Sequence, residues 1–312
     1  ESLMNPLHSH AQSENPFAST EFEHVKERRA ATAKWITLGI SILLVVPMVW
    51  IFTLMATKAA PVLSWEYLTT DVSRMGAAGG IWGPLIGTFW LTLVCLLLVA
   101  PIGIGAGIYL NEYARDNAFT RAILVAVTSL AGVPSIVHAL FGLGAFVGAM
   151  RFGLSLTYAA LTLAVMTLPI IIASTREALA SVPRNFREAC WNLGASRWQT
   201  IRTIVLPNSV SGILTGVILV VARAAGETAP IMLTGAAAYF KISPYFPERL
   251  APYGLRDQFM AMSYHLNLIC RDVPNMSEAM KFGSAFVLLI LILLINSVAI
   301  TVRVSLRRRK RW

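Results

Sequence analysis

The chain alternates between long apolar stretches and shorter polar connections. A helix rises about 1.5 Å per residue, so roughly 20 apolar residues cross the hydrocarbon layer of a membrane, which is about 30 Å thick. Six stretches are long enough: Trp35 to Met55, Gly83 to Leu110, Ala122 to Met150, Ser155 to Ala173, Val210 to Gly235, and Phe282 to Val302. The fourth and the sixth contain no charged residue, which argues against buried helices of a soluble core. The pattern predicts an all-α polytopic membrane protein with six transmembrane helices.

Composition and charge agree with this pattern. Of 312 residues, 56% are hydrophobic and 13% are charged, which is more apolar surface than one soluble globule can hide. With the N-terminus inside, most of the 26 lysines and arginines fall on the inner side, so both termini are predicted to be cytoplasmic. The net charge of +10 does not indicate nucleic-acid binding, because the charges lie at membrane edges. The basic tail, residues 304–312, is expected to meet anionic lipid headgroups of a bacterial inner membrane.

The first 34 residues are polar and lack the pattern of a secretory signal peptide, so we expect the first span to remain in the mature protein. Thr20 and Glu23 have the spacing of a capping box. They predict a short amphipathic helix on the inner membrane surface, and a solvated tail fits the same residues equally well.

A polar, arginine-containing segment, residues 183–207, lies between the fourth and fifth apolar stretches. Pro183 suits the first turn of a helix that ends near Leu193, before Gly194, and Ser196 with Gln199 forms a second capping box. The segment therefore predicts two helices joined at a glycine turn. Four small or apolar residues of the first helix share one face: Phe186, Ala189, Cys190 and Leu193. Such a face can enter a groove of a partner protein or lie on the lipid surface.

Glu188-Ala189-Cys190, followed at fixed spacing by Gly194 and by Ile204-Val205-Leu206-Pro207, resembles the E-A-A-x3-G-x9-I-x-L-P loop of ABC importer permeases. The departure is Cys190 in place of an alanine. The resemblance implies that this loop forms a coupling helix that docks on an ABC ATPase homodimer. Its coupling residues would be Arg187, Glu188, Ala189, Cys190 and Gly194. It also implies the type I importer permease fold for residues 35–303.

Two further segments resemble the phosphate-specific permeases of this superfamily. Ala222 to Pro230 is similar to their R-A-x-G-E-T-A-P segment, and Ala131 to Val137 is similar to their G-V-P-S-I-V segment. His138 departs from the family pattern. The resemblance extends from Ala33 to Arg303 and is closest to the A-type subunit. It implies a phosphate pathway shared with a homologous permease, and an extracytoplasmic phosphate-binding protein that delivers the ion.

Arg223 and Glu227 stand out from the residues alone, because they are charged and four apart within the fifth apolar stretch. A charge at the centre of a membrane helix costs about 2.5–3.5 kcal/mol on insertion scales, so such residues pair or line an aqueous path. One interpretation is a mutual ion pair that locks the bundle. The other is a pathway arginine that attracts phosphate and returns to Glu227 when the path is empty.

Pro134 and Ser135 offer a second candidate contact for the anion. A helix broken by proline exposes backbone N–H groups beside a hydroxyl, although a plain structural kink explains the proline as well. His138, one turn later, fits a packing residue rather than a proton relay.

The connections 56–82 and 236–281 are predicted to lie outside the membrane. The second is rich in aromatic residues and should contain a short helix near Arg256 to Leu268. It can contact the delivery protein or form an ordered cap.

No lysine follows a glycine, so the chain has no phosphate-binding loop for ATP, and ATP and magnesium are assigned to the partner ATPase. The chain itself is expected to hold no cofactor or metal and to be a transport subunit, not an enzyme. The alternatives are a permease for another oxyanion, such as sulfate or molybdate, and a polytopic membrane enzyme. The enzyme lacks support because neither H-E-x-x-H nor G-x-S-x-G occurs.

Overall fold

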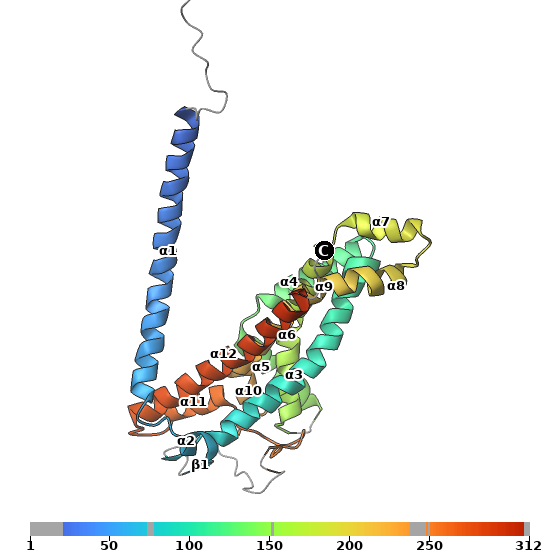
Figure 1. The fold of residues 1–312 in the computed structure, drawn as a ribbon. Helices are drawn as coiled ribbons and strands as arrows, with labels where there is room; N and C mark the ends of the chain where they lie inside the picture. Colours follow the sequence, from blue (N-terminus) through green and yellow to red (C-terminus); the bar gives the residue numbers. More distant parts are fainter. Residues whose placement is uncertain (1–20, 74–77, 151–152, 238–247, 249, 309–312) are drawn as a thin grey trace, which may run out of the picture. The chain divides into compact units, whose positions relative to one another are not determined.

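The computed structural model describes residues 21–73, 78–150, 153–237, 248 and 250–308 (Figure 1). These residues form helices joined by short connections, together with a ribbon of two antiparallel strands, β1 (Val72–Ser73) and β2 (Ala78–Gly79). The chain divides into two compact units, residues 1–54 and residues 55–312.

Helix α1 (Glu21–Ala59) is continuous over 39 residues and supplies the first unit as far as Leu54. Every side chain from residue 29 to residue 54 is exposed, although the helix contains an 18-residue window with a mean hydropathy of 2.4. Lipid or another apolar protein surface must therefore cover it. The predicted short surface helix is not separate, because α1 continues from Glu21 into the first span. Thr20, its predicted cap, lies outside the described residues.

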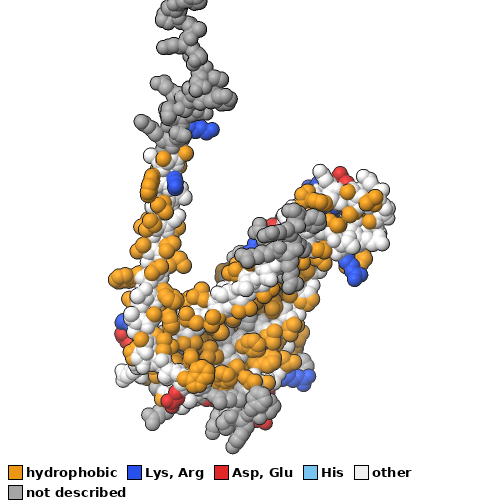
Figure 2. All heavy atoms as spheres, viewed as in Figure 1, with side chains coloured by type: hydrophobic (Ala, Val, Ile, Leu, Met, Phe, Trp, Pro, Cys, Tyr) orange, Lys and Arg blue, Asp and Glu red, His pale blue; other side chains and the backbone are white. Residues whose placement is uncertain are grey.

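The other spans belong to the second unit. Four are single helices: α3 (Trp82–Ile108), α6 (Leu156–Ala180), α9 (Leu206–Gly226) and α12 (Glu278–Arg308). In the described part of the chain, five helices, counting α1, are long and apolar enough to cross a membrane, and a bent pair makes a sixth. Hydrophobic side chains cover the visible face of the second unit, while charged side chains lie toward its ends (Figure 2). The prediction of six membrane-spanning segments in an all-α protein is confirmed.

Two predicted spans are interrupted: the third at Pro134, where a proline break or kink was predicted, and the fifth at Glu227, where none was. The third is not one rod: α4 (Ala118–Ala131) and α5 (Ser135–Gly142), which the π-helical η3 (Leu143–Ala149) continues, meet at 103°. Pro134 stands at the break and favours it, because it has no N–H and disfavours helical backbone in the residue before it. The fifth ends at Gly226, since Glu227 is extended, with φ −73° and ψ 139°. A separate short helix, α10 (Ala229–Thr234), follows.

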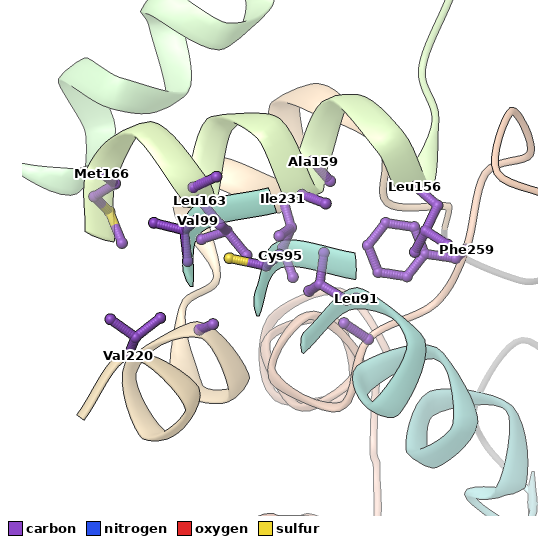
Figure 3. Close-up of a cluster of buried hydrophobic side chains, with 14 of the residues drawn as sticks. Leu91, Cys95, Val99, Leu156, Ala159, Leu163, Met166, Val220, Ile231 and Phe259 are labelled. Carbon is purple, nitrogen blue, oxygen red and sulfur yellow. The ribbon is translucent and has the colours of Figure 1, made fainter. Parts of the chain in front are cut away.

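The core of the second unit lies where α3, α6 and α9 meet. Its buried side chains include Leu91, Cys95, Val99, Leu163, Met166, Val220, Ile231 and Phe259 (Figure 3). Glycines bring the helices close together, because a residue without a Cβ lets two helix backbones approach. A Cβ on Gly107 of α3 would lie 2.7 Å from Thr175 Cβ of α6, and one on Gly212 of α9 would lie 2.5 Å from Ala178 Cβ.

A cap of short elements closes one end of the second unit. It comprises α2 (Trp65–Thr69), the ribbon and α11 (Met262–Arg271). Tyr67 of α2 hydrogen-bonds Ser284 of α12 at 2.8 Å, and the backbone N–H of Leu156 donates to the carbonyl of Asp257 at 2.9 Å. The short helix predicted near 256–268 is α11, which begins and ends later in the chain than expected. Residues 238–247, which hold several of the predicted aromatic contacts, lie outside the described residues.

Candidate functional site

A helical hairpin projects from the end of the second unit opposite the cap (Figure 1). Its first helix, α7, spans Arg184–Asn192, and its second, α8 (Arg197–Thr200), continues through the π-helical η4 (Ile201–Val205) into α9. Gly194 joins them with φ +82°, a conformation that favours glycine. Ser196 and Gln199 form the expected capping box. The predicted hairpin is therefore confirmed.

The outer surface of the hairpin exposes large apolar side chains among polar and charged ones. The exposed fractions are 47% for Phe186, 88% for Leu193 and 55% for Trp198. Glu188 and Ala189 are also exposed, and Cys190 is half-buried. This arrangement presents small and apolar residues to a partner, as the amphipathic pattern predicts.

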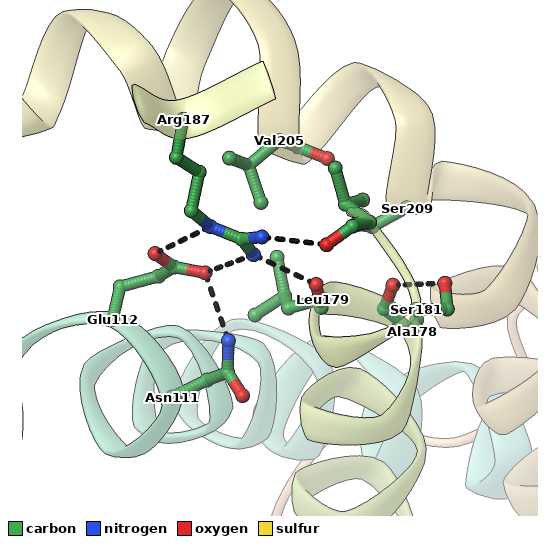
Figure 4. Close-up of polar contacts among 9 residues, drawn as sticks. Asn111, Glu112, Ala178, Leu179, Ser181, Arg187, Val205 and Ser209 are labelled. Atoms are coloured by element: carbon green, nitrogen blue, oxygen red, sulfur yellow. Dashed lines mark hydrogen bonds and ion pairs between the residues drawn. The ribbon is translucent and has the colours of Figure 1, made fainter. Parts of the chain in front are cut away.

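Arg187 differs from the other predicted coupling residues because it is the buried residue of α7. Its Nη2 donates to Glu112 Oε1 at 2.8 Å and to the carbonyl of Leu179 at 2.8 Å. Its Nη1 donates to the carbonyl of Val182 at 2.6 Å. The Arg187 and Glu112 side chains are only 10% and 9% exposed (Figure 4). Arg187 therefore faces inward, unlike Glu188 and Ala189, which are exposed.

Glu112 lies in the π-helical η2 (Tyr109–Tyr113), which continues α3, and Asn111 Nδ2 donates to Glu112 Oε1 at 2.8 Å (Figure 4). The sequence prediction missed Glu112, because it precedes Arg187 by 75 residues. The signal that could have found Glu112 was its place as an acidic residue just after the second apolar stretch.

A cavity of about 400 Å³ lies between the hairpin and the ends of α3 and α6. Its lining includes Asn111, Glu112, Arg184, Arg187, Glu188, Trp191, Arg197 and Thr200. The Glu112–Arg187 pair thus borders open space instead of a packed apolar core.

The second predicted site lies at the break between α9 and α10. Arg223 is in the last turn of α9, and its Nε is 3.2 Å from Glu227 Oε1. The side chains are 37% and 18% exposed. Ser263 Oγ donates to the carbonyl of Glu227 at 2.7 Å, which ties the break to α11. The predicted pairing is confirmed, but Arg223 stands at a helix end, where a cation also interacts favourably with the helix dipole.

Ser135 is the first residue of α5, directly after the break at Pro134. It is partly exposed, and no hydrogen bond or ion pair within the described ranges joins it to Arg223 or Glu227. The elements are nevertheless linked, because α5 packs against α10, which follows Glu227. His138 is buried at 3% exposure, in agreement with a packing role.

His265 of α11 is a buried group in the cap that the sequence prediction did not assign. It is 2% exposed, and its Nδ1 has no hydrogen-bond partner among the described residues. Burial lowers the pKa of His265 from 6.5 to about 4, because the charged imidazolium loses its hydration. His265 is therefore neutral at pH 7.

Known proteins are similar to this chain in sequence and in fold. The chain is 31% identical over 258 residues to the probable ABC transporter permease protein YqgI of Bacillus subtilis, covering 81% of this chain and 87% of that protein. It is 32% identical over 288 residues to the phosphate transport system permease protein PstA 2 of Mycobacterium bovis, covering 91% of each.

A solved structure has the same fold: a bacterial ABC transporter involved in the import of the acidic polysaccharide alginate. The TM-score is 0.54 at 16% identity, over 89% of this chain and 97% of that chain. Residues 100–312 match the family of binding-protein-dependent transport system inner membrane components. The chain therefore belongs to this family of multi-pass inner-membrane permeases.

Proposed function

We propose that this chain is a permease subunit of an ATP-driven importer of inorganic phosphate. The observation that carries the proposal is the Arg223–Glu227 pair at the break between α9 and α10. Several relatives are named phosphate transport system permeases, including one from Haemophilus influenzae that is 38% identical over 191 residues. The chain is a transport component and not an enzyme.

Arg223 is suited to a transient contact with an anion. A guanidinium binds phosphate oxygens through two parallel N–H groups, and it remains charged at any physiological pH. Its partner Glu227 is held by the extended backbone beyond the helix and by the contact with Ser263. Phosphate can replace the carboxylate at Arg223 and then leave again, which suits a pathway that must release its cargo. Ser135 is a second candidate contact for phosphate, because it begins α5, which packs against α10.

Membership of the family implies an ATPase and a binding protein as partners. We assign the exposed face of the hairpin to an ATPase homodimer, which holds ATP and magnesium. A homologous permease completes the pathway, and a phosphate-binding protein meets the cap. Closure of the ATPase dimer then displaces the hairpins and alternates the pathway between its two openings.

The first prediction concerns Arg223→Gln in the complete complex, reconstituted in proteoliposomes with the binding protein. Removing one partner of a poorly solvated charge interaction costs about 2–5 kcal/mol, so phosphate uptake should fall by roughly a hundredfold or more. Radioactive phosphate uptake measures the effect, and co-purification of the subunits shows whether the complex still assembles.

Arg121→Gln is the matched control, because Arg121 is an exposed arginine of α4, outside both the hairpin and the cap, and should leave uptake unchanged. Normal uptake by Arg223→Gln would contradict the pathway role. Restored uptake by the exchange of Arg223→Glu with Glu227→Arg would identify a structural lock instead. Uptake of sulfate or molybdate, but not phosphate, by the wild-type complex would contradict the substrate assignment.

A further inference from the structure

The attachment of α7 to the span bundle depends on one side chain. Arg187 is the buried residue of this helix, while Phe186, Glu188 and Ala189 are exposed. The covalent connections of α7 lead to α6 through residues 181–183 and to α8 through Gly194. Neither connection leads to α3. Within the described residues, the ion pair between Arg187 and Glu112 joins α7 to the end of α3, so a displacement of α7 can reach α3 directly through it.

The contact has the geometry of a stiff link. The two Nη atoms of Arg187 donate to Glu112 and to two carbonyls at the C-terminal end of α6, those of Leu179 and Val182. The Leu179 carbonyl lies in the last turn of α6, where the negative end of the helix dipole favours a cation, and Val182 follows the end of this helix. A planar guanidinium with several charge-assisted hydrogen bonds has little freedom to rotate. One residue thus fixes α7 to the ends of both α3 and α6.

Packing does not duplicate this link. The cavity of about 400 Å³ lies beside the ion pair, so no layer of apolar side chains fills the space between α7 and η2. The small apolar cluster nearby comprises Leu179, Val182 and Val205, with Ile108 packed against it, and contains no residue of α7. That cluster packs the ends of α3 and α6 against η4. Arg187 therefore attaches α7 to helix ends that are already joined to one another.

We propose that the Glu112–Arg187 ion pair transmits the movement of the coupling helix α7 to α3 and α6, which makes Glu112 a positioning residue for import. The proposal rests on the function proposed above. Glu112 and Arg187 have no contact with phosphate in this scheme. Loss of either side chain should uncouple ATP hydrolysis from phosphate transport, while the ATPase and the binding protein still bind.

The test measures phosphate transported per ATP hydrolysed by the reconstituted complex with its binding protein. Glu112→Gln and Arg187→Gln should each lower this ratio by about tenfold, within the range of coupling effects measured in other proteins, while hydrolysis continues. The double variant should be no worse than either single variant, because both remove the same interaction. Arg121→Gln is the control: it breaks the exposed ion pair with Asp116 and should not change the ratio.

An unchanged ratio in both Gln variants overturns the proposal. Loss of ATPase co-purification also overturns it, because the pair would then only shape the docking surface. If the Gln variants do not assemble, Asn111→Ala decides the question, since Asn111 orients the Glu112 carboxylate. We expect a fall of about threefold for it, and an unchanged ratio counts against the link. A wild-type complex that hydrolyses ATP without moving phosphate contradicts the proposed function instead.

Discussion

His265 illustrates how a single buried side chain gives this protein a dependence on pH. The unfolded chain binds a proton at this residue below about pH 6.5, but the folded protein does so only below about pH 4. Between these values the unfolded state binds more protons, so stability falls as the pH falls. Lowering the pH from 7 to 5 should remove roughly 2 kcal/mol of stability through this residue.

The measurement is the thermal midpoint of the purified protein in detergent at pH 7 and at pH 5, for wild type and for His265→Gln. The glutamine does not titrate, so the variant should lose less stability on acidification. An equal loss in both proteins would mean that another group controls the acid sensitivity.

The two arginine–glutamate pairs were not equally predictable. Arg223 and Glu227 are four residues apart, so their spacing in the sequence indicated a contact, although Glu227 lies just beyond the end of α9. Arg187 and Glu112 are 75 residues apart, and their contact depends on the packing of α3 against α6. The sequence therefore indicated the local pair, whereas it predicted Arg187 only as a coupling residue and gave no sign of its contact with Glu112.

At the scale of elements, the contact between α3 and α6 depends on glycines at specific faces. A Cβ on Gly107 would lie 2.7 Å from Thr175 Cβ, whereas a Cβ on Gly105 of the same helix would meet nothing within 4 Å. Gly107→Ala should therefore destabilise the protein by about 1–3 kcal/mol through overpacking, despite the better helix propensity of alanine. Gly105→Ala is the matched control and should be neutral or slightly stabilising.

Thermal midpoints of the two glycine variants in detergent give the comparison. If Gly107→Ala were as stable as Gly105→Ala, the close approach of α3 and α6 would not matter for stability.

Hydropathy predicts where the chain enters the membrane but not where its backbone turns. The apolar composition continues across Pro134 and across Glu227. The proline predicted a break at the first position, whereas no break was predicted at the second. A proline alone does not decide whether a span bends. Pro101 and Pro169 lie inside continuous helices, while Pro134 stands at a break of 103°. Packing of α5 against α6 and α10 selects the bend at Pro134. These breaks matter because they place Ser135 and Arg223 at helix ends.

At the scale of the whole molecule, the hairpin and the cap occupy opposite ends of the second unit (Figure 1). The distribution of lysine and arginine predicts that the hairpin end faces the cytoplasm. The proposed function requires the same orientation, since an ATPase that consumes cytoplasmic ATP must reach the hairpin. Helix packing alone does not distinguish the two orientations, because the bundle is apolar around its middle in either case.

The native cysteines allow a direct test of this orientation. Cys270 is exposed at the end of α11, Cys190 is half-buried in α7, and Cys95 is buried in the core. A membrane-impermeant maleimide should therefore label Cys270 in right-side-out vesicles and the hairpin only in inverted vesicles, with mass spectrometry locating the label. Ala189→Cys supplies a fully exposed thiol on α7, and Cys270→Ser should abolish labelling from the outside. If the Ala189→Cys thiol reacts in right-side-out vesicles, the hairpin faces away from the cytoplasm and cannot meet a cytoplasmic ATPase.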